Sequence, residues 1–166
     1  MNRLLLTLLL ALAAVPASAA GVGGIFGQGR TGFALTVGNG YAYDNSYLVI
    51  GASATYYVID GLGVGLSFEN WSGGNPSMTK YAPLVQYVFN RTSPLMPYVG
   101  AFYRHTNISG QSSIDSYGER AGIYYSSGSN GYVGFGIVNE SYLDCASTGY
   151  SPCSSTYPEI SLAFVF

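Results

Sequence analysis

Large apolar residues alternate with small or polar residues along most of the chain. Residues 62–69, LGVGLSFE, show this most clearly, because every second position is a large apolar side chain. Successive side chains of a β-strand point to opposite faces of a sheet, so a period of two predicts strands rather than helices. The same pattern predicts eight strands, at residues 31–39, 47–58, 62–69, 80–89, 98–105, 117–126, 132–139 and 159–166.

The connections between these strands are expected to alternate in length. Two are short (60–61 and 127–131), one is moderate (90–97), and four are longer and rich in Gly, Ser and Asn (39–46, 70–79, 106–116 and 141–157). Asp60-Gly61 favours a tight hairpin, since both turn positions accept a positive φ. Pro83 cannot donate a ladder hydrogen bond, so we expect a bulge there. Short turns at one end and long loops at the other are typical of outer-membrane barrels.

The first 19 residues have the pattern of a secretory signal peptide. Arg3 supplies a positive charge, residues 4–15 form a short apolar run, and Ala-Ser-Ala at 17–19 matches a small-residue cleavage site. The run is shorter than the roughly 20 residues that a transmembrane helix needs, and Pro16 interrupts it. We therefore expect cleavage after residue 19 and a single domain over residues 20–166.

Composition restricts the environment of this exported domain. Charged residues make up 8% of the chain, against about 25% in a typical soluble domain. No stretch of 18 consecutive apolar residues follows the signal peptide. Only helices and closed barrels satisfy all their backbone hydrogen bonds inside a bilayer. The pattern therefore predicts an all-β fold, an eight-stranded antiparallel up-and-down transmembrane β-barrel. Without Arg3, five basic residues face eight acidic ones, so nucleic acid is not an expected partner.

The two faces of each strand are expected to meet different surroundings. Apolar side chains should face lipid, whereas Gly, Ser, Thr and charged side chains should face the lumen. Side chains fill the interior of an eight-stranded barrel, so a water-filled channel is not expected. Five charged residues fall on inward positions toward the long loops. We expect them to form a network that plugs the outer lumen: Glu69, Lys80, Arg104, Arg120 and Glu159.

Many tyrosines lie near the predicted strand ends. Their amphipathic rings suit the interfacial aromatic girdle of a membrane barrel, although tyrosine is also a good strand residue in general. We therefore expect a girdle that includes Tyr41, Tyr43, Tyr47, Tyr56, Tyr57, Tyr81, Tyr98, Tyr117, Tyr132 and Tyr157.

The last strand, EISLAFVF, alternates up to a final aromatic residue, with Ile160, Leu162, Phe164 and Phe166 on one face. This ending resembles the signal that the outer-membrane assembly machinery reads in bacterial barrels. VIDGLGVGLSFEN and MPYVGAFYR also resemble hairpins of small barrels of the OmpA-transmembrane and OmpX type. The resemblance extends over essentially the whole mature chain. It departs from OmpA itself, since we expect no periplasmic peptidoglycan-binding domain after Phe166.

The resemblance implies a location in the outer membrane of a Gram-negative bacterium and a monomeric barrel. It implies contact with outer-membrane lipid and lipopolysaccharide, and with the assembly machinery during insertion. Barrels of this kind are known for charge networks that hold the lumen closed. No cofactor or metal is expected.

Cys145 and Cys153 are the only cysteines, and both lie in the longest predicted loop. An exported protein meets an oxidising compartment, so we expect a disulfide between them. Closing so short a loop would contribute about 2–3 kcal/mol to local order. The spacing is not that of a Cys-x-x-Cys redox motif, and the only histidine lies elsewhere, which disfavours a metal site.

His105 is the candidate for catalysis, because some small outer-membrane barrels are lipid A deacylases or palmitoyltransferases. A serine hydrolase needs a serine and an acid near the histidine. Ser109 and Glu119 are close in sequence, but the His-x-Ser strand pattern of the deacylases is absent, since Asn107 stands two residues after His105. We expect no enzyme activity and interpret His105 as a residue at the lipid headgroups.

The leading functional hypothesis is a structural or surface-interaction role, in which extracellular loops contact surface polysaccharide, other cells or host molecules. Three alternatives remain open at this stage. The barrel could be a narrow channel for small or apolar solutes, or an enzyme that modifies lipid A. The chain could also be a soluble lipocalin-like binder, whose apolar side chains would then point inward.

Overall fold

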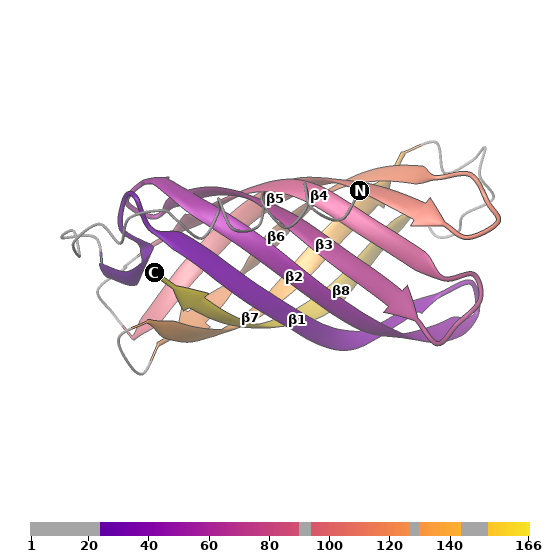
Figure 1. The fold of residues 1–166 in the computed structure, drawn as a ribbon, viewed down its shortest axis with the longest axis horizontal. Coiled ribbons are helices and arrows are strands. Elements are labelled where there is room, and N and C mark those ends of the chain that lie inside the picture. The colour runs from indigo at the N-terminus through magenta and orange to yellow at the C-terminus, as the bar shows by residue number, and fades with distance from the viewer. Residues whose placement is uncertain (1–23, 90–93, 127–129, 144–152) are drawn as a thin grey trace, which may run out of the picture.

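The computed structural model describes residues 24–89, 94–126, 130–143 and 153–166, and these form a closed barrel of eight antiparallel strands (Figure 1). Each strand pairs with its neighbours in the chain, and β1 pairs with β8, which confirms the predicted up-and-down barrel. A single turn of 3₁₀-helix, η1 (Gly24–Phe26), precedes the strands. The strands are β1 (Thr31–Ala42), β2 (Asn45–Ile59), β3 (Leu62–Ser72), β4 (Met78–Val88), β5 (Leu95–Ile108), β6 (Ile114–Tyr125), β7 (Gly131–Tyr142) and β8 (Ser154–Val165).

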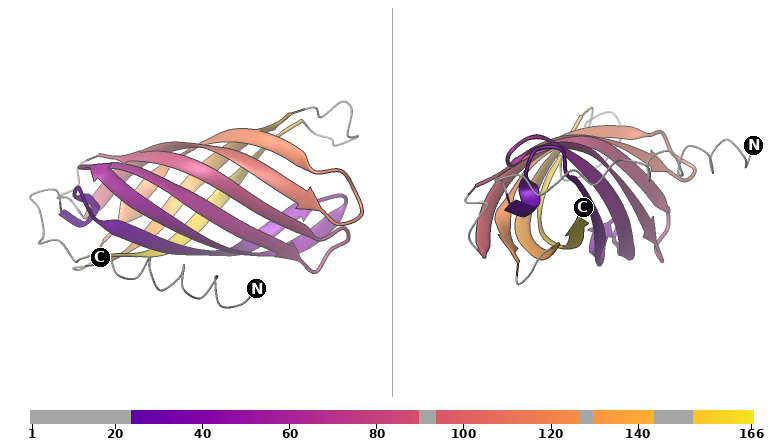
Figure 2. Two further views of the ribbon diagram at one scale, coloured as in Figure 1. Left: turned by 45° about the horizontal axis from the view of Figure 1, so that its top comes forward. Right: turned by 60° about the vertical axis from the view of Figure 1, so that its left-hand side comes forward.

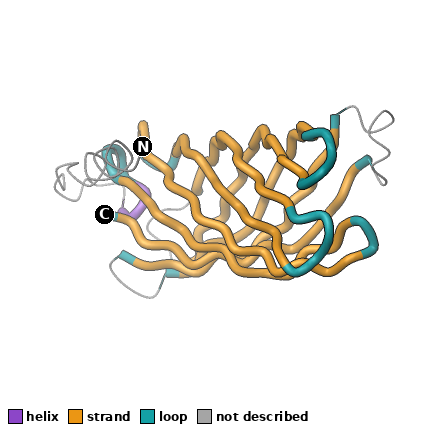
Figure 3. Tube along the Cα trace, turned by 45° about the vertical axis from the view of Figure 1, so that its right-hand side comes forward, coloured by secondary structure: helices purple, strands orange, loops and turns teal. Residues whose placement is uncertain are grey.

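The predicted signal peptide lies outside the described residues, so its cleavage stays a prediction. Within the described residues, no helix has the length and hydropathy to cross a membrane. The C-terminus lies at the same end of the barrel as η1 and the β2–β3 turn (Figure 2). The β1–β2, β3–β4 and β5–β6 connections lie at the other end, called the outer end below, where β7 ends and β8 begins (Figure 1 and Figure 3).

The strands at the outer end are longer than the sequence pattern predicts. The expected loop at 39–46 is a two-residue turn at Tyr43 and Asp44, with φ of 49° and 57°. These positive φ values match a type I′ hairpin turn. The connections after β3 and β5 are likewise reduced to residues 73–77 and 109–113. The predictions of long loops there were wrong, because the alternation reverses at these strand ends: apolar Trp71 and Met78 point into the lumen, while polar Asn70 and Thr79 face outward.

Pro83 produces no bulge. β4 keeps one register against β5 on both sides of Pro83, from Met78↔Ile108 to Val88↔Tyr98, and only the pairs at residues 82 and 83 are missing from the ladder. The irregularity lies in β2 instead, where the register against β3 shifts between Tyr57 and Ile59. The chain thus accommodates the missing N–H of Pro83 locally.

An apolar belt surrounds the barrel, as the alternation predicts. Leu35, Leu66, Ile137 and Phe164 are each more than half exposed, and they come from β1, β3, β7 and β8. Water is a poor solvent for such a surface, whereas lipid is a good one. The described residues of the lumen, in contrast, pack into three layers of buried side chains. The belt overturns the lipocalin-like alternative, in which large apolar residues would point inward.

The three layers of the lumen differ in character. The outer layer is mostly apolar and includes Tyr47, Trp71 and Met78. The middle layer combines apolar residues, Phe102 and Val138 among them, with the buried charges described below. The inner layer is a cluster of aromatic and apolar side chains: Phe26, Tyr57, Val88, Met96, Tyr98, Tyr124, Tyr132, Ala163 and Val165.

The seam between β1 and β8 is shorter than the other strand pairs. Gly32–Thr36 pairs with Ser161–Val165, and Thr31 and Phe166 exchange two backbone hydrogen bonds at its inner end. No ladder pair joins the outer part of β1, from Val37 onward, to β8. The outer part of β1 is paired on its other side with β2, and the outer part of β8 is paired with β7.

Candidate functional site

Arg104 lies at the centre of a buried ion cluster in the outer half of the lumen. It projects inward from β5 and is 1% exposed. Its Nη2 donates to Glu69 Oε1 of β3 at 2.9 Å, and its Nη1 donates to Glu140 Oε2 of β7 at 2.8 Å. Nη1 also lies 2.9 Å from the Tyr157 hydroxyl of β8. One guanidinium therefore joins four strands across the lumen.

Neutral groups hold the two carboxylates of this cluster in place. The hydroxyls of Ser116 and Tyr157 donate to Glu140 at 2.6 and 2.8 Å. Trp71 Nε1 donates to Glu69 Oε2 at 3.1 Å. Buried charges are expensive unless they are paired and hydrogen-bonded, and these donors meet that requirement.

Lys80 and Arg120 belong to the same part of the lumen. Lys80 is 2% exposed, and its Nζ lies 3.7 Å from the centroid of the Trp71 ring. Arg120 Nη1 forms an ion pair with Glu159 Oε1 at 3.2 Å. Arg104 and Arg120 both lie over the Phe102 ring, at 4.5 and 5.6 Å from its centroid.

All five predicted charged residues thus point into the lumen, where they form two ion-paired groups and three cation–π contacts. The sequence analysis missed Glu140, which is completely buried. It ended the seventh strand at Asn139, although continued alternation would have placed residue 140 on the inward face. The roles of Ser116 and Tyr157 were also missed, because hydroxyl groups are common at inward positions.

The predicted tyrosine girdle is only partly correct. Tyr56, Tyr81 and Tyr117 face outward and are about half exposed, as expected. Five of the other predicted members point into the lumen instead, because each lies at an inward-facing position of its strand: Tyr47, Tyr57, Tyr98, Tyr132 and Tyr157. The side chain of Tyr41 lies outside the described part of the structure.

Aromatic rings close the inner end of the lumen. The Phe26 ring of η1 lies 5.4 Å from the Tyr57 ring and 4.9 Å from the Tyr132 ring, measured between centroids. Tyr98 and Tyr124 are stacked at 4.1 Å. Gln86 forms hydrogen bonds with two hydroxyl groups of this layer: its amide nitrogen donates to Tyr57, and its amide oxygen accepts from Tyr124. The result is a packed aromatic layer.

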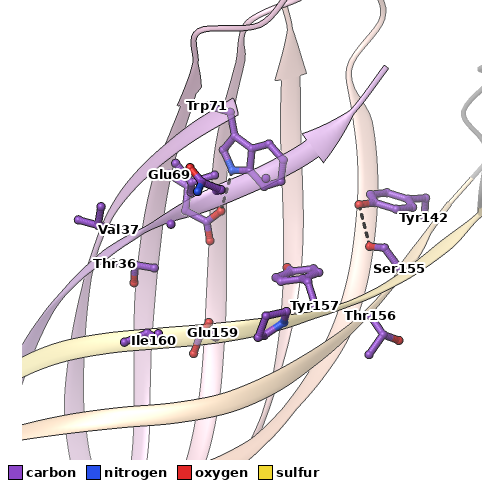
Figure 4. A pocket seen from close by; sticks show the side chains of 15 residues that line it. Thr36, Val37, Glu69, Trp71, Tyr142, Ser155, Thr156, Tyr157, Glu159 and Ile160 are labelled. Carbon is purple, nitrogen blue, oxygen red and sulfur yellow. Dashed lines mark hydrogen bonds between the residues drawn. The ribbon is translucent and has the colours of Figure 1, made fainter. Parts of the chain in front are cut away.

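A cavity of about 310 Å³ opens at the outer half of the β1–β8 seam, from Val37 and Ile160 outward (Figure 4). The two strands are not paired there, and this region is called the parted half of the seam below. Trp71 and Glu69 of β3 form its inner wall, and Val37 and Ile160 lie at its outer side. Both inward-facing and outward-facing residues of β1 and β8 line the cavity, so it extends through the barrel wall. Two smaller voids deeper in the lumen measure about 30 and 20 Å³.

His105 faces outward, near the outer end of β5. Its Nδ1 lies 2.5 Å from Asp115 Oδ1, and its Nε2 lies 3.2 Å from Asn107 Oδ1. Its ring contacts that of Tyr81, with centroids 5.1 Å apart. In the described part of the structure, neither ring nitrogen is hydrogen-bonded to a serine. No group of three or more His, Cys, Asp or Glu side chains able to hold a metal occurs among the described residues.

The remaining predicted residues lie in β8 and the loop before it. Ile160, Leu162, Phe164 and Phe166 all face outward and are 54–64% exposed. The carbonyl of Cys153 accepts a hydrogen bond from the Tyr142 amide at 2.9 Å. Cys145 lies outside the described residues, so the disulfide between Cys145 and Cys153 stays a prediction.

A closed barrel with an apolar belt, a lumen filled by side chains and an even number of strands defines the class of small outer-membrane β-barrel proteins. No protein-family model matches the sequence, and no curated protein matches it either.

Three solved structures are similar to the chain. The N-terminal β-barrel domain of Pseudomonas aeruginosa OprF is 18% identical with a TM-score of 0.66, and the match covers 84% of this chain and 99% of that domain. Neisserial surface protein A (NspA) is 16% identical with a TM-score of 0.56, covering 82% and 94%. The outer membrane protein OprG of P. aeruginosa is 15% identical with a TM-score of 0.49, covering 82% and 93%. The OprF domain and NspA confirm the expected resemblance to small outer-membrane barrels for the fold.

Proposed function

We propose that the chain is a structural barrel of the bacterial outer membrane that conducts no ions and presents its outer hairpins to the cell's surroundings. The observation that carries this proposal is the position of Arg104. It is held by Glu69, Glu140 and Tyr157 from three other strands, so the middle of the lumen is crossed by short hydrogen bonds.

The remaining space in the lumen also supports a closed barrel. The voids of about 30 and 20 Å³ beside Arg120 each have room for only one or two water molecules. The aromatic layer around Phe26 lies between these voids and the inner end. A hydrated ion would have to displace both the ion cluster and the rings.

Single-channel recording in planar bilayers tests this proposal against the narrow-channel alternative. The wild-type protein should be electrically silent. The double variant Arg104→Ser with Glu140→Ser removes the central ion pair and should give measurable openings more often. Regular conductance by the wild-type protein would contradict the proposal. Glu119→Gln, a change at an exposed position outside the lumen, is the matched control.

In the proposed surface role, the outer hairpins contact lipopolysaccharide or molecules of a host or another cell. This orientation can be tested by inserting an epitope tag between Gln111 and Ser112, in the β5–β6 connection. Antibody should label intact cells that carry this tag. A tag inserted at Gln28, at the inner end, should be labelled only after the cells are permeabilised. The reverse result would overturn the orientation.

The outward row that ends at Phe166 supports a role as the signal for the outer-membrane assembly machinery. Its aromatic end is not buried, so its sequence can be changed without filling or emptying the core. Phe166→Ser should lower the amount of barrel inserted in cells, while Leu162→Ile should leave it unchanged. Equal insertion of both variants would sink this role.

We propose further that His105 is structural and that the chain is not an enzyme. Its two ring nitrogens contact Asp115 and Asn107, which suits a polar group at the lipid headgroups. Mass spectrometry of lipid A from cells with and without the protein tests this statement. A modification that depends on the protein and disappears in His105→Ala would contradict it.

A further inference from the structure

We propose that the parted half of the β1–β8 seam is a binding site for a small amphipathic molecule that enters from the membrane. The ligand class has an apolar body and a neutral or cationic head that donates hydrogen bonds. This inference goes beyond the structural role proposed above, since a barrel that conducts no ions can still hold a ligand in its wall.

The ladder between β1 and β8 ends partway along the seam. β1 and β8 pair from Gly32↔Val165 to Thr36↔Ser161 and no further. Backbone groups inside a bilayer have no water to bond with, so unpaired strand edges are costly there. A ligand with hydrogen-bonding groups that sat between these edges would offset part of that cost.

The sequence at the seam favours such an opening. A Cβ added at Gly38 would meet no atom within 4 Å, so the space beside this residue is open. Pro158 of β8, which also lines the cavity, lacks an N–H, and proline within a sheet is found mainly at edges. At Gly40, a Cβ would lie 2.2 Å from the Trp71 ring, so this glycine lets the indole lie against the β1 backbone.

The cavity at the seam has the size and the apolar surface of a small-molecule site. Its volume of about 310 Å³ is at the lower end of the roughly 300–1,000 Å³ typical of small-molecule sites. Val37 and Ile160 are 66% and 54% exposed on the lipid-facing side, so the entrance is continuous with the apolar belt. Trp71, farther in, supplies an aromatic wall. These surfaces suit the apolar body of the ligand.

The polar wall of the cavity carries carboxylate and hydroxyl groups. The carboxylates of Glu69 and Glu159 both line the cavity, together with hydroxyl groups such as that of Thr36. Their partners Arg104 and Arg120 do not line it, so the charged side chains on its wall are acidic. A wall rich in acceptors favours a donating head and repels an anionic one.

Trp71 is the only tryptophan of the chain, so its fluorescence reports on the cavity directly. We would place the full protein in phosphatidylcholine vesicles and add 10-doxylnonadecane, an apolar quencher that dissolves in the bilayer. Efficient quenching of Trp71 is the expected result. Acrylamide, a quencher in water, separates entry from the membrane from entry through the outer end. Quenching by acrylamide alone would overturn the membrane route.

Gly38→Phe fills the open side of the seam. It should reduce the constant for quenching of Trp71 fluorescence by 10-doxylnonadecane at least twofold. Gly131→Leu is the matched control, since its Cβ would make ordinary contacts at 3.7 Å far from the cavity. A heat-modifiability gel establishes that both variants are folded. If folded Gly38→Phe is quenched as strongly as the wild type, the seam is not the route to Trp71.

Head-group preference is tested with octylamine, octanol and octanoate, which share one chain. Octylamine and octanol should relieve the quenching by competition, at concentrations at least fivefold lower than octanoate. Glu159→Gln should weaken the preference for octylamine, while Glu119→Gln, outside the cavity, should not. Equal effects of the three compounds on the wild type and on Gly38→Phe would indicate partition into the bilayer only and would contradict the site.

Discussion

Arg104 and Glu140 form an ion pair in the middle of the barrel, with 2.8 Å between Nη1 and Oε2 and side chains that are 2% and 0% exposed. They belong to β5 and β7, which are not neighbours in the sheet, so the contact crosses the lumen. It ties together parts of the wall that backbone hydrogen bonds do not join.

Removing Arg104 should destabilise the barrel strongly. Arg104→Ala leaves Glu69 and Glu140 buried without their cation, and breaking a buried pair costs about 3–5 kcal/mol. Urea-induced unfolding in lipid vesicles, followed by circular dichroism, measures the loss. The control is His105→Ala, which breaks a partly exposed pair with Asp115 that should contribute about 0–1 kcal/mol. Equal losses in the two variants would refute the central role of Arg104.

A charge on the apolar belt should be costly in a way that depends on the face. Leu66 is 66% exposed on β3, so Leu66→Arg places a guanidinium against lipid. The free energy of unfolding should fall by about 2–4 kcal/mol, as for lipid-facing positions near the bilayer midplane. Leu66→Ile should be nearly neutral in the same titration. A barrel that tolerates both changes equally would contradict the assignment of the belt.

Phe26 should contribute to stability although it lies outside the strands. Its side chain is fully buried against Tyr57, Tyr124 and Tyr132. Phe26→Ala should lower the free energy of unfolding by about 3–5 kcal/mol, and Phe26→Leu by less than about 1.5 kcal/mol. Thermal unfolding in detergent can rank the variants. Unchanged stability in Phe26→Ala would mean that η1 does not hold the aromatic layer together.

The disulfide prediction has a direct chemical check. Protein purified from the cell envelope and alkylated without reduction should carry no label on Cys145 or Cys153, whereas prior reduction should allow two labels. Peptide mass spectrometry distinguishes the two states. Labelling of both thiols in the unreduced sample would show that the bond does not form.

The closed barrel also predicts the behaviour of the protein on a gel. Samples in mild detergent should migrate differently with and without boiling, because only boiling separates β1 from β8 and unfolds the ladder. Fractionation should place the protein with the outer membrane. A soluble periplasmic protein without such a shift would contradict the membrane assignment.

The alternation of residues such as Leu66 and Ser67 was enough to predict the fold, because lipid and lumen impose opposite demands on successive side chains. The same rule placed Glu69 and Arg104 on the inward face. It failed where that contrast is reversed. Beyond the belt, Ala42 and Tyr47 are buried in the lumen. Apolar residues therefore no longer mark the outward face, and the strands could not be followed to their turn at Tyr43 and Asp44.

Two further features could not be read from the chain. Tyrosine suits both a membrane interface and a packed lumen. Tyr56 faces outward and Tyr57 faces the lumen only because they are successive residues of one strand. The parted seam depends on where β1 and β8 meet after the sheet has closed. Gly38 and Pro158 favour an opening there, but each residue alone is compatible with an ordinary strand.

The short pairing between β1 and β8 has a mechanical consequence. To widen the barrel at any other junction, long runs of ladder hydrogen bonds must be broken, as along β2 and β3 from Leu48↔Ser72 to Ile59↔Leu62. At the outer half of the seam, from Val37 and Ile160 outward, no ladder bond has to be broken. The circumference is therefore most compliant along this one line, while the inner end stays fastened by Thr31 and Phe166.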